Sequence, residues 1–121
     1  MTITNYGGNR IALLIGGSIT NIPESFFIGT GSGIPKLTDT TLIDGKDAQK
    51  FTSTTYPSST KITYQGDWNS IEMSGIQLRE FGIGTGSIAT GSIWSRTSLP
   101  ALNFDGTNEL RIIENWEVLV Q

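Results

Sequence analysis

Short apolar stretches separated by polar turns recur along the chain, and several of them alternate with a period of two. The clearest case spans residues 110–121, where one set of alternate positions is mostly apolar and the other is mixed. Successive side chains of a β-strand point to opposite faces, so this period predicts a strand. Glu114 interrupts the apolar face, which indicates an edge, a bulge or a partner at that position.

The remaining apolar stretches predict further strands. Residues 10–15 form a continuous apolar run whose length favours a strand over a short helix, and no helical period persists over any longer window. Pro57 and Pro100 are expected to end their strands, and a slip near Gly75 predicts a bulge or a loop. The other expected strands are 25–28, 51–56, 60–64, 71–83 and 88–99, with the longest loop at 36–50.

One turn sequence is used twice. An apolar stub followed by Gly-Thr-Gly-Ser occurs at residues 27–32 and again at 81–87. Glycine reaches positive φ without steric cost, so each copy is typical of a strand that ends in a tight turn. The repeat predicts two similar strand-and-turn units packed together.

Composition supports a small all-β domain. The chain has 121 residues, of which 36% are hydrophobic and 15 are glycine, and polar Ser and Thr are abundant. Such a chain forms one core, and Ser, Thr and Gly disfavour helix interiors. We predict a single antiparallel β-sandwich or jelly-roll-like domain of about seven or eight strands over residues 10–121. Residues 1–9, with Gly7 and Gly8, are predicted to form a flexible N-terminal arm that orders on docking.

Charge and residue usage exclude several classes of function. The net charge is −3 and the eight cations are scattered, so the basic stripe that nucleic-acid binding requires is missing. The chain has neither cysteine nor histidine, which removes thiolate metal sites and the usual proton shuttle. The apolar run at 11–15 is too short for a signal peptide or a membrane span, so no membrane partner is expected.

Two motifs could suggest a ligand, and both are better explained as turns. Residues 84–89 satisfy a relaxed dinucleotide pattern, but residues 90–92 break the chain where a helix should follow. Asp39, Asp44 and Asp47 crowd one loop, yet their spacing matches no established calcium loop. We therefore expect no metal and no cofactor.

Paired carboxylates are the remaining route to catalysis. Glu80 and Glu114 are expected to be partly buried and paired with Arg79, Arg96 or Arg111, and a structural salt bridge is the default interpretation. No nucleophile, base and orienting residue form a recognisable unit. The sequence therefore predicts that the protein is not an enzyme.

The aromatic residues provide the candidate contact residues. Trp68 lies in an apparent turn at 66–70 and is expected to be exposed, so with Tyr64 it could form a stacking platform for a sugar ring. Trp94 and Trp116 fall within strand patterns, where core packing is favoured. Trp116 belongs to the C-terminal strand, which is itself a candidate contact element, so Trp68, Tyr64 and Trp116 are retained as candidate contacts.

With these features in order, the chain resembles a family of small bacteriophage virion proteins of the tail-fibre or tail-associated type. Members show a strand into Gly-Thr-Gly, a Thr-Asp-Thr-x-Leu loop, a Glu-x-Gly strand, an aromatic-x-Arg strand and a closing strand that contains Trp. Pro35 and a second Gly-Thr-Gly after Glu80 depart from that pattern. The matching stretches are 28–32 with 38–42, 80–83 with 92–96, and 108–112 through 116–118.

The resemblance implies a structural component of the phage particle in the tail, neck, baseplate or capsid. Such a subunit would reside in the virion, and in the host cytoplasm before assembly. Its expected partners are copies of itself and other virion proteins of the tail, portal or capsid, bound through strand edges, the C-terminal strand and loop tips. The alternative is a carbohydrate-binding module that recognises host glycans through Trp68 and Tyr64, and a hydrolase ranks last.

Overall fold

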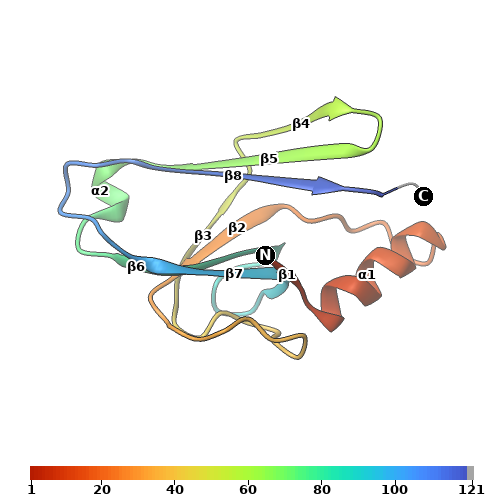
Figure 1. Cartoon of the computed structure of the whole chain (residues 1–121), viewed down its shortest axis with the longest axis horizontal. Helices are drawn as coiled ribbons and strands as arrows, with labels where there is room; N and C mark the ends of the chain where they lie inside the picture. Colours follow the sequence, from red (N-terminus) through yellow and green to blue (C-terminus); the bar gives the residue numbers. More distant parts are fainter. Residues whose placement is uncertain (120–121) are drawn as a thin grey trace.

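Two antiparallel β-sheets packed face to face form the molecule (Figure 1), which confirms the expected all-β, sandwich-like fold. The computed structural model describes residues 1–119. In chain order the elements are β1 (Thr2–Ile3), α1 (Asn5–Ile15), β2 (Ser25–Gly29), β3 (Gly45–Lys50), β4 (Ser53–Ser58), β5 (Lys61–Trp68), α2 (Ser70–Met73), β6 (Gln77–Thr85), β7 (Ser92–Asn103) and β8 (Leu110–Glu117).

The larger sheet has the strand order β1-β7-β6-β2-β3, and the smaller sheet has the order β4-β5-β8. The two strands that lead into the repeated turn sequence, β2 and β6, are direct neighbours in the larger sheet. Ser25 pairs with Gly84 and Gly29 pairs with Glu80. Since the two strands are antiparallel, their Gly-Thr-Gly exits leave opposite ends of the sheet.

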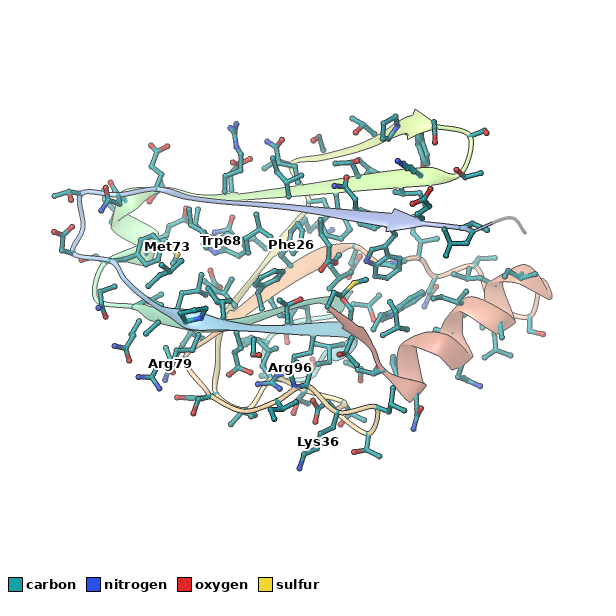
Figure 2. The ribbon with its side chains drawn as sticks, in the orientation of Figure 1. Phe26, Lys36, Trp68, Met73, Arg79 and Arg96 are labelled. Carbon is teal, nitrogen blue, oxygen red and sulfur yellow. The ribbon has the colours of Figure 1, made fainter. Side chains whose placement is uncertain are left out.

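The main core lies between the sheets, where Phe26, Trp68 and Met73 are fully buried (Figure 2). Burial of each large apolar side chain contributes about 1.5–3 kcal/mol. The Phe26 ring is edge-on to Phe51, with a centroid distance of 5.1 Å. Gly66 on β5 makes this packing possible, because a Cβ at that position would lie 2.4 Å from a Phe26 ring carbon.

The N-terminal segment differs from the sequence-based prediction. Residues 1–9, expected as a flexible arm, form β1 and the beginning of α1, and the strand expected at 10–15 is the rest of that helix. Thr4 explains the helix start, because its hydroxyl accepts a hydrogen bond from the Gly7 N–H and caps the first turn. The Thr4 N–H and hydroxyl also donate to the carbonyls of Trp94 and Ile93, which ties the segment to β7.

Gly7 has a packing role that its sequence context hid. A Cβ on Gly7 would lie 2.1 Å from the carbonyl oxygen of Trp94. Only glycine therefore allows α1 to approach β7 this closely, and the glycine that suggested flexibility is in fact a requirement of tight packing.

Both prolines expected to end strands lie inside them. Pro57 is within β4, an edge strand, and Pro100 is within β7 beyond the short stretch that pairs with β1. An edge position needs no hydrogen bond from the missing N–H, so proline is tolerated there. Gly75 has a φ of 79° in the loop after α2, which agrees with the expected break.

Two further boundaries differ from the prediction. The expected loop at 36–50 ends in β3, and the residues before Gly75 include the short helix α2, where Asn69 and Glu72 form a capping box. The final strand ends at Glu117, and the Val120 and Gln121 positions that were included in it lie outside the described residues.

Candidate interaction surface

The β8 strand forms a free edge of the smaller sheet. It pairs with β5 from Lys61 opposite Glu117 to Trp68 opposite Leu110, without a register shift. Within residues 1–119, no strand pairs with its other side. The eight residues span about 26 Å. This edge therefore presents a row of backbone N–H and C=O groups without strand partners.

The other sheet edges are shorter or carry features that discourage pairing. β1 has only two residues, and β3 carries Lys46 at a register shift and Lys50 at its other end. β4 contains Pro57 and a register shift between Thr55 and Ser58. Proline, lysine and bulges are the usual protections of an exposed edge. β8 has no proline, lysine or irregularity, and its inward-pointing Glu114 is the one such feature it carries, so it is the longest regular edge among the described residues.

An apolar groove of about 580 Å³ lies beside β8. It is formed by the N-terminal segment, α1, the residues just before β2, all three strands of the smaller sheet and Trp94 of β7. Ile15, Tyr56 and Val118 are 84%, 72% and 68% exposed at its mouth. Its larger apolar lining residues are Met1, Ile3, Ile11, Leu14, Ile15, Ile22, Tyr56, Ile62, Tyr64, Trp94, Trp116 and Val118, and Thr54, Thr60, Asn115 and Glu117 are polar residues of the lining. A contiguous apolar surface of this kind marks an interaction site more often than a solvated face.

Buried polar groups lie close to the groove. Glu114 of β8 is 8% exposed and accepts a hydrogen bond of 3.0 Å from the Trp116 Nε1–H. Burial raises the pKa of Glu114, against the opposing effect of this hydrogen bond. The Nε1–H of Trp94 and the hydroxyl of Ser95 are buried without a partner among the described residues. Ile83 pairs with Ser95 and Gly84 with Ile93, so Trp94 is the extra residue of a bulge.

Of the three predicted contact residues, the fold brings Tyr64 and Trp116 together and buries Trp68 elsewhere. Trp68 is only 1% exposed, so the expectation that it lies in an exposed turn was wrong. It is the last residue of β5, and its Nε1–H donates to Asp47 at 2.9 Å. Tyr64 and Trp116 are brought together with ring centroids 5.5 Å apart, and both line the groove. Burial raises the pKa of Tyr64 to about 12.

Glu80 forms a structural salt bridge with Arg96, one of the three arginines that the sequence offered as partners. Both side chains are fully buried, and the Arg96 Nε lies 3.1 Å from Glu80 Oε1. The carboxylate also accepts hydrogen bonds of 2.7–2.9 Å from the N–H groups of Gly31, Ile43 and Asp44. Arg96 lies on the face of β7 away from the main core (Figure 2) and donates to the Gly33 carbonyl. The pair therefore clamps the loop between β2 and β3 onto the sheet.

The three loop aspartates have separate structural partners. Asp39 lies 3.5 Å from Arg96, Asp44 accepts from the Thr30 hydroxyl, and Asp47 accepts from Trp68. Within residues 1–119 there is no group of three or more acidic, His or Cys side chains placed to hold a metal ion. Neither helix in this part of the chain has the length and apolar character needed to cross a membrane.

The sequence did not reveal the part of the groove contributed by α1. Ile11, Leu14 and Ile15 line it with the spacing i, i+3 and i+4 of one helical face. That spacing was the available signal, but it was hidden within a continuous apolar run. Comparison with protein-family models, curated proteins and solved structures found no match for this chain.

Proposed function

We propose that this protein is a structural subunit of a bacteriophage particle, which joins copies of itself and other virion proteins through the β8 edge and the adjacent groove. The observation that carries the proposal is the long, regular edge of β8 beside exposed apolar side chains. Strand addition at such an edge provides main-chain hydrogen bonds, and neighbouring apolar surface provides affinity. The resemblance to small tail-associated proteins supports the virion as the place of assembly.

The groove supports a protein partner because its mouth is open and apolar. Ile15, Ile22, Tyr56 and Val118 are all exposed there. Covering an exposed apolar side chain of this size stabilises a complex by about 1.5–3 kcal/mol before the costs of association. In a repetitive assembly each subunit makes this contact many times, so several such residues on one surface contribute to holding a neighbouring subunit.

Glycan recognition receives less support. The proposed sugar platform required an exposed Trp68, whereas the indole is buried in the core and bonded to Asp47. Tyr64 is also buried, with its ring stacked on Phe51 at 4.5 Å. Trp116 is the only one of the three candidate contacts with substantial accessible surface, and one aromatic ring is a small platform for a sugar.

The proposal is tested by the protein composition of purified particles from a phage that encodes this chain. Quantitative mass spectrometry should find the chain in many copies per particle. Its absence from intact particles, while it is abundant in the infected cell, would contradict the proposal.

A pair of matched variants tests whether the groove is used in assembly. Ile15→Asp places a charge at the groove mouth, and Ile71→Asp places one at an equally exposed position on α2, 83% exposed against 84%. We expect Ile15→Asp to lower incorporation into particles by about tenfold or more, since a desolvated charge at an interface is costly. Ile71→Asp should be incorporated normally. Equal incorporation of the two variants would exclude the groove as a contact surface.

A further inference from the structure

We infer that β8 pairs with the β8 strand of a second copy, antiparallel and centred on Glu114, so that the two smaller sheets form one continuous sheet. This inference rests on the proposed self-association and adds the surface, the partner and the register. A two-fold related pair of identical strands is fixed by the residue at its centre. The side chains along β8, and the residues of β5 opposite them, decide which residue lies at this centre.

The alternation of faces limits the choice. Ile112, Glu114 and Trp116 face the core side of the sheet, whereas Arg111, Ile113, Asn115 and Glu117 face outward. Opposite residues in a sheet share a face, so the two-fold axis must pass through a residue. An axis between two residues would place core-side residues opposite solvent-facing ones. The candidate centres near the middle of the strand are therefore Ile113, Glu114 and Asn115.

The outer face is complementary when Glu114 is the centre. Arg111 of one copy then lies opposite Glu117 of the other, and this happens twice. Within one chain Glu117 is opposite Lys61, and Arg111 is opposite Asp67 with an Nε to Oδ1 distance of 2.7 Å. The hydrogen bonds from Arg111, Thr52 and Gln65 hold the pKa of Asp67 at about 2, so that carboxyl is ionised at neutral pH. Across the four strands β5, β8, β8 and β5 of the dimer, the row Lys61, Glu117, Arg111, Asp67 would then alternate in charge. Cross-strand pairs of opposite charge are stabilising.

The core-side face is complementary in the same register on either side of the centre, where the two Glu114 side chains lie opposite each other. Ile112 lies opposite Trp116 of the second copy, and Leu110 lies opposite Val118. Val118 is 68% exposed in one chain, so this pairing would cover an apolar side chain that is otherwise in water. Aromatic pairs with β-branched residues are among the favourable cross-strand contacts.

The two neighbouring registers are less complementary. A centre at Ile113 would place Glu117 opposite Glu109 and Ile112 opposite Glu114. A centre at Asn115 would place Ile113 opposite Glu117 and Glu114 opposite Trp116. Both remove the Arg111 to Glu117 pairs and place a carboxyl against an apolar side chain, which has a desolvation cost. At the Glu114 centre the two Glu114 carboxyls lie opposite each other, and because like charges directly opposite are destabilising, this rung requires a proton shared between them. On the Ile112–Trp116 and Leu110–Val118 rungs apolar residues face apolar ones, and on the two Arg111–Glu117 rungs opposite charges meet.

A mixing experiment tests the register. Arg111→Glu creates two Glu–Glu oppositions in its own dimer, and Glu117→Arg creates two Arg–Arg oppositions. A mixture of the two variants restores an Arg–Glu pair at both positions. By sedimentation equilibrium we expect a dimer for the wild type, a dissociation constant raised about tenfold to a hundredfold for each variant alone, and recovery in the mixture. Glu109→Arg is the control, because it would strengthen only the register centred on Ile113.

Cross-linking provides a second measurement that does not depend on charge. The chain has no cysteine, so introduced thiols report on a single pair. Ile113→Cys and Asn115→Cys face each other only between different chains of the proposed dimer, at a Cβ separation of about 4.5–5.5 Å. Mild oxidation should therefore link a mixture of the two variants faster than either alone. Faster linking of Ile113→Cys alone, or of Asn115→Cys alone, would overturn the register.

The results separate this inference from the proposed function. Self-pairing of β8 would be overturned by a wild type that stays monomeric at the highest soluble concentration. It would also be overturned by a dimer whose dissociation constant is the same in the wild type and in the charge variants. In both cases the test on phage particles remains valid. A dimer with the predicted behaviour, together with absence of the chain from particles, would overturn the virion role and leave the β8 dimer established.

Discussion

Gly7 shows how a single residue controls the position of an element. The carbonyl of Trp94 occupies the space that a Cβ on Gly7 would need, whereas a Cβ on the neighbouring Gly8 would meet nothing within 4 Å. Two adjacent glycines in one helix therefore have different roles. Gly7 is required for close packing of α1 on β7, and Gly8 only lowers the intrinsic helix propensity.

These roles predict opposite effects of alanine. Gly7→Ala should destabilise the fold by about 1–3 kcal/mol because the helix must move away from β7. Gly8→Ala should be neutral, or stabilising by up to about 1 kcal/mol, because alanine is the better helix former. Urea unfolding of the two variants measures the difference. Equal effects would show that α1 does not approach β7 as described.

Glu114 predicts a dependence of stability on pH. Burial raises the pKa of this carboxyl in the folded chain, while the hydrogen bond from Trp116 and the positive N-terminus oppose the shift. A raised pKa means that the folded state binds the proton more tightly than the unfolded state. The stability contributed by Glu114 is therefore present at pH below its ordinary pKa and is lost as pH rises through the raised value.

The Glu114→Gln variant removes that loss. At low protein concentration, the variant should be more stable than the wild type at neutral pH. The difference should shrink as the pH falls from the raised pKa toward the ordinary value of 4.5 and should stay constant below it. Urea midpoints between pH 4 and pH 8 measure this difference. A difference that is independent of pH would show that the carboxyl is not held in a desolvated position.

At the scale of elements, alternation predicted β8 well because one of its faces is buried and the other is exposed. The same method missed α1, since the apolar run from Ile11 to Ile15 fits a helix and a buried strand equally. The deciding information was the contact of Thr4 and Gly7 with β7, which is remote in sequence. The groove could not be predicted for the same reason, because it exists only once α1 is placed beside the smaller sheet.

Trp68 was misplaced through its local sequence. Gly66 and Asp67 resemble a turn, but Gly66 is a strand residue whose missing side chain makes room for Phe26. A structural salt bridge at Glu80 was predictable, but the sequence left Arg79, Arg96 and Arg111 open as partners, and the fold selects Arg96. Its second role, holding the loop of residues 30–44, depends on backbone N–H groups that no sequence pattern displays.

The Glu80–Arg96 pair, which holds the loop of residues 30–44, predicts that the single substitution Glu80→Gln lowers the stability of the fold strongly. Glu80→Gln removes the charge that balances buried Arg96, and loss of one partner of a buried ion pair costs about 3–5 kcal/mol. The amides of Gly31, Ile43 and Asp44 should also exchange with solvent faster, as measured by NMR hydrogen exchange. Lys46→Gln, which removes an exposed pair with Asp44, is the control and should change stability by less than about 1 kcal/mol. A mild effect of Glu80→Gln would show that the clamp is dispensable.

At the scale of the whole molecule, the two edges of the smaller sheet differ in how well they are protected from further strand pairing. One end of the smaller sheet is protected by Pro57 and a register shift in β4, while β8 presents a regular edge beside an apolar groove. The sandwich core itself is complete, with its large aromatic residues buried. The molecule therefore has a stable interior and one surface whose backbone and side-chain groups are suited to a neighbouring subunit.

The β8 edge is tested most directly by hydrogen exchange of its amides as a function of protein concentration. The N–H groups of residues 110–117 that point away from β5 should exchange quickly in dilute protein and slow by about tenfold or more as the protein is concentrated. The free edges of β3 and β4 should show no such change. Exchange in β8 that is independent of concentration, or protection that appears only at β3 or β4, would contradict the account.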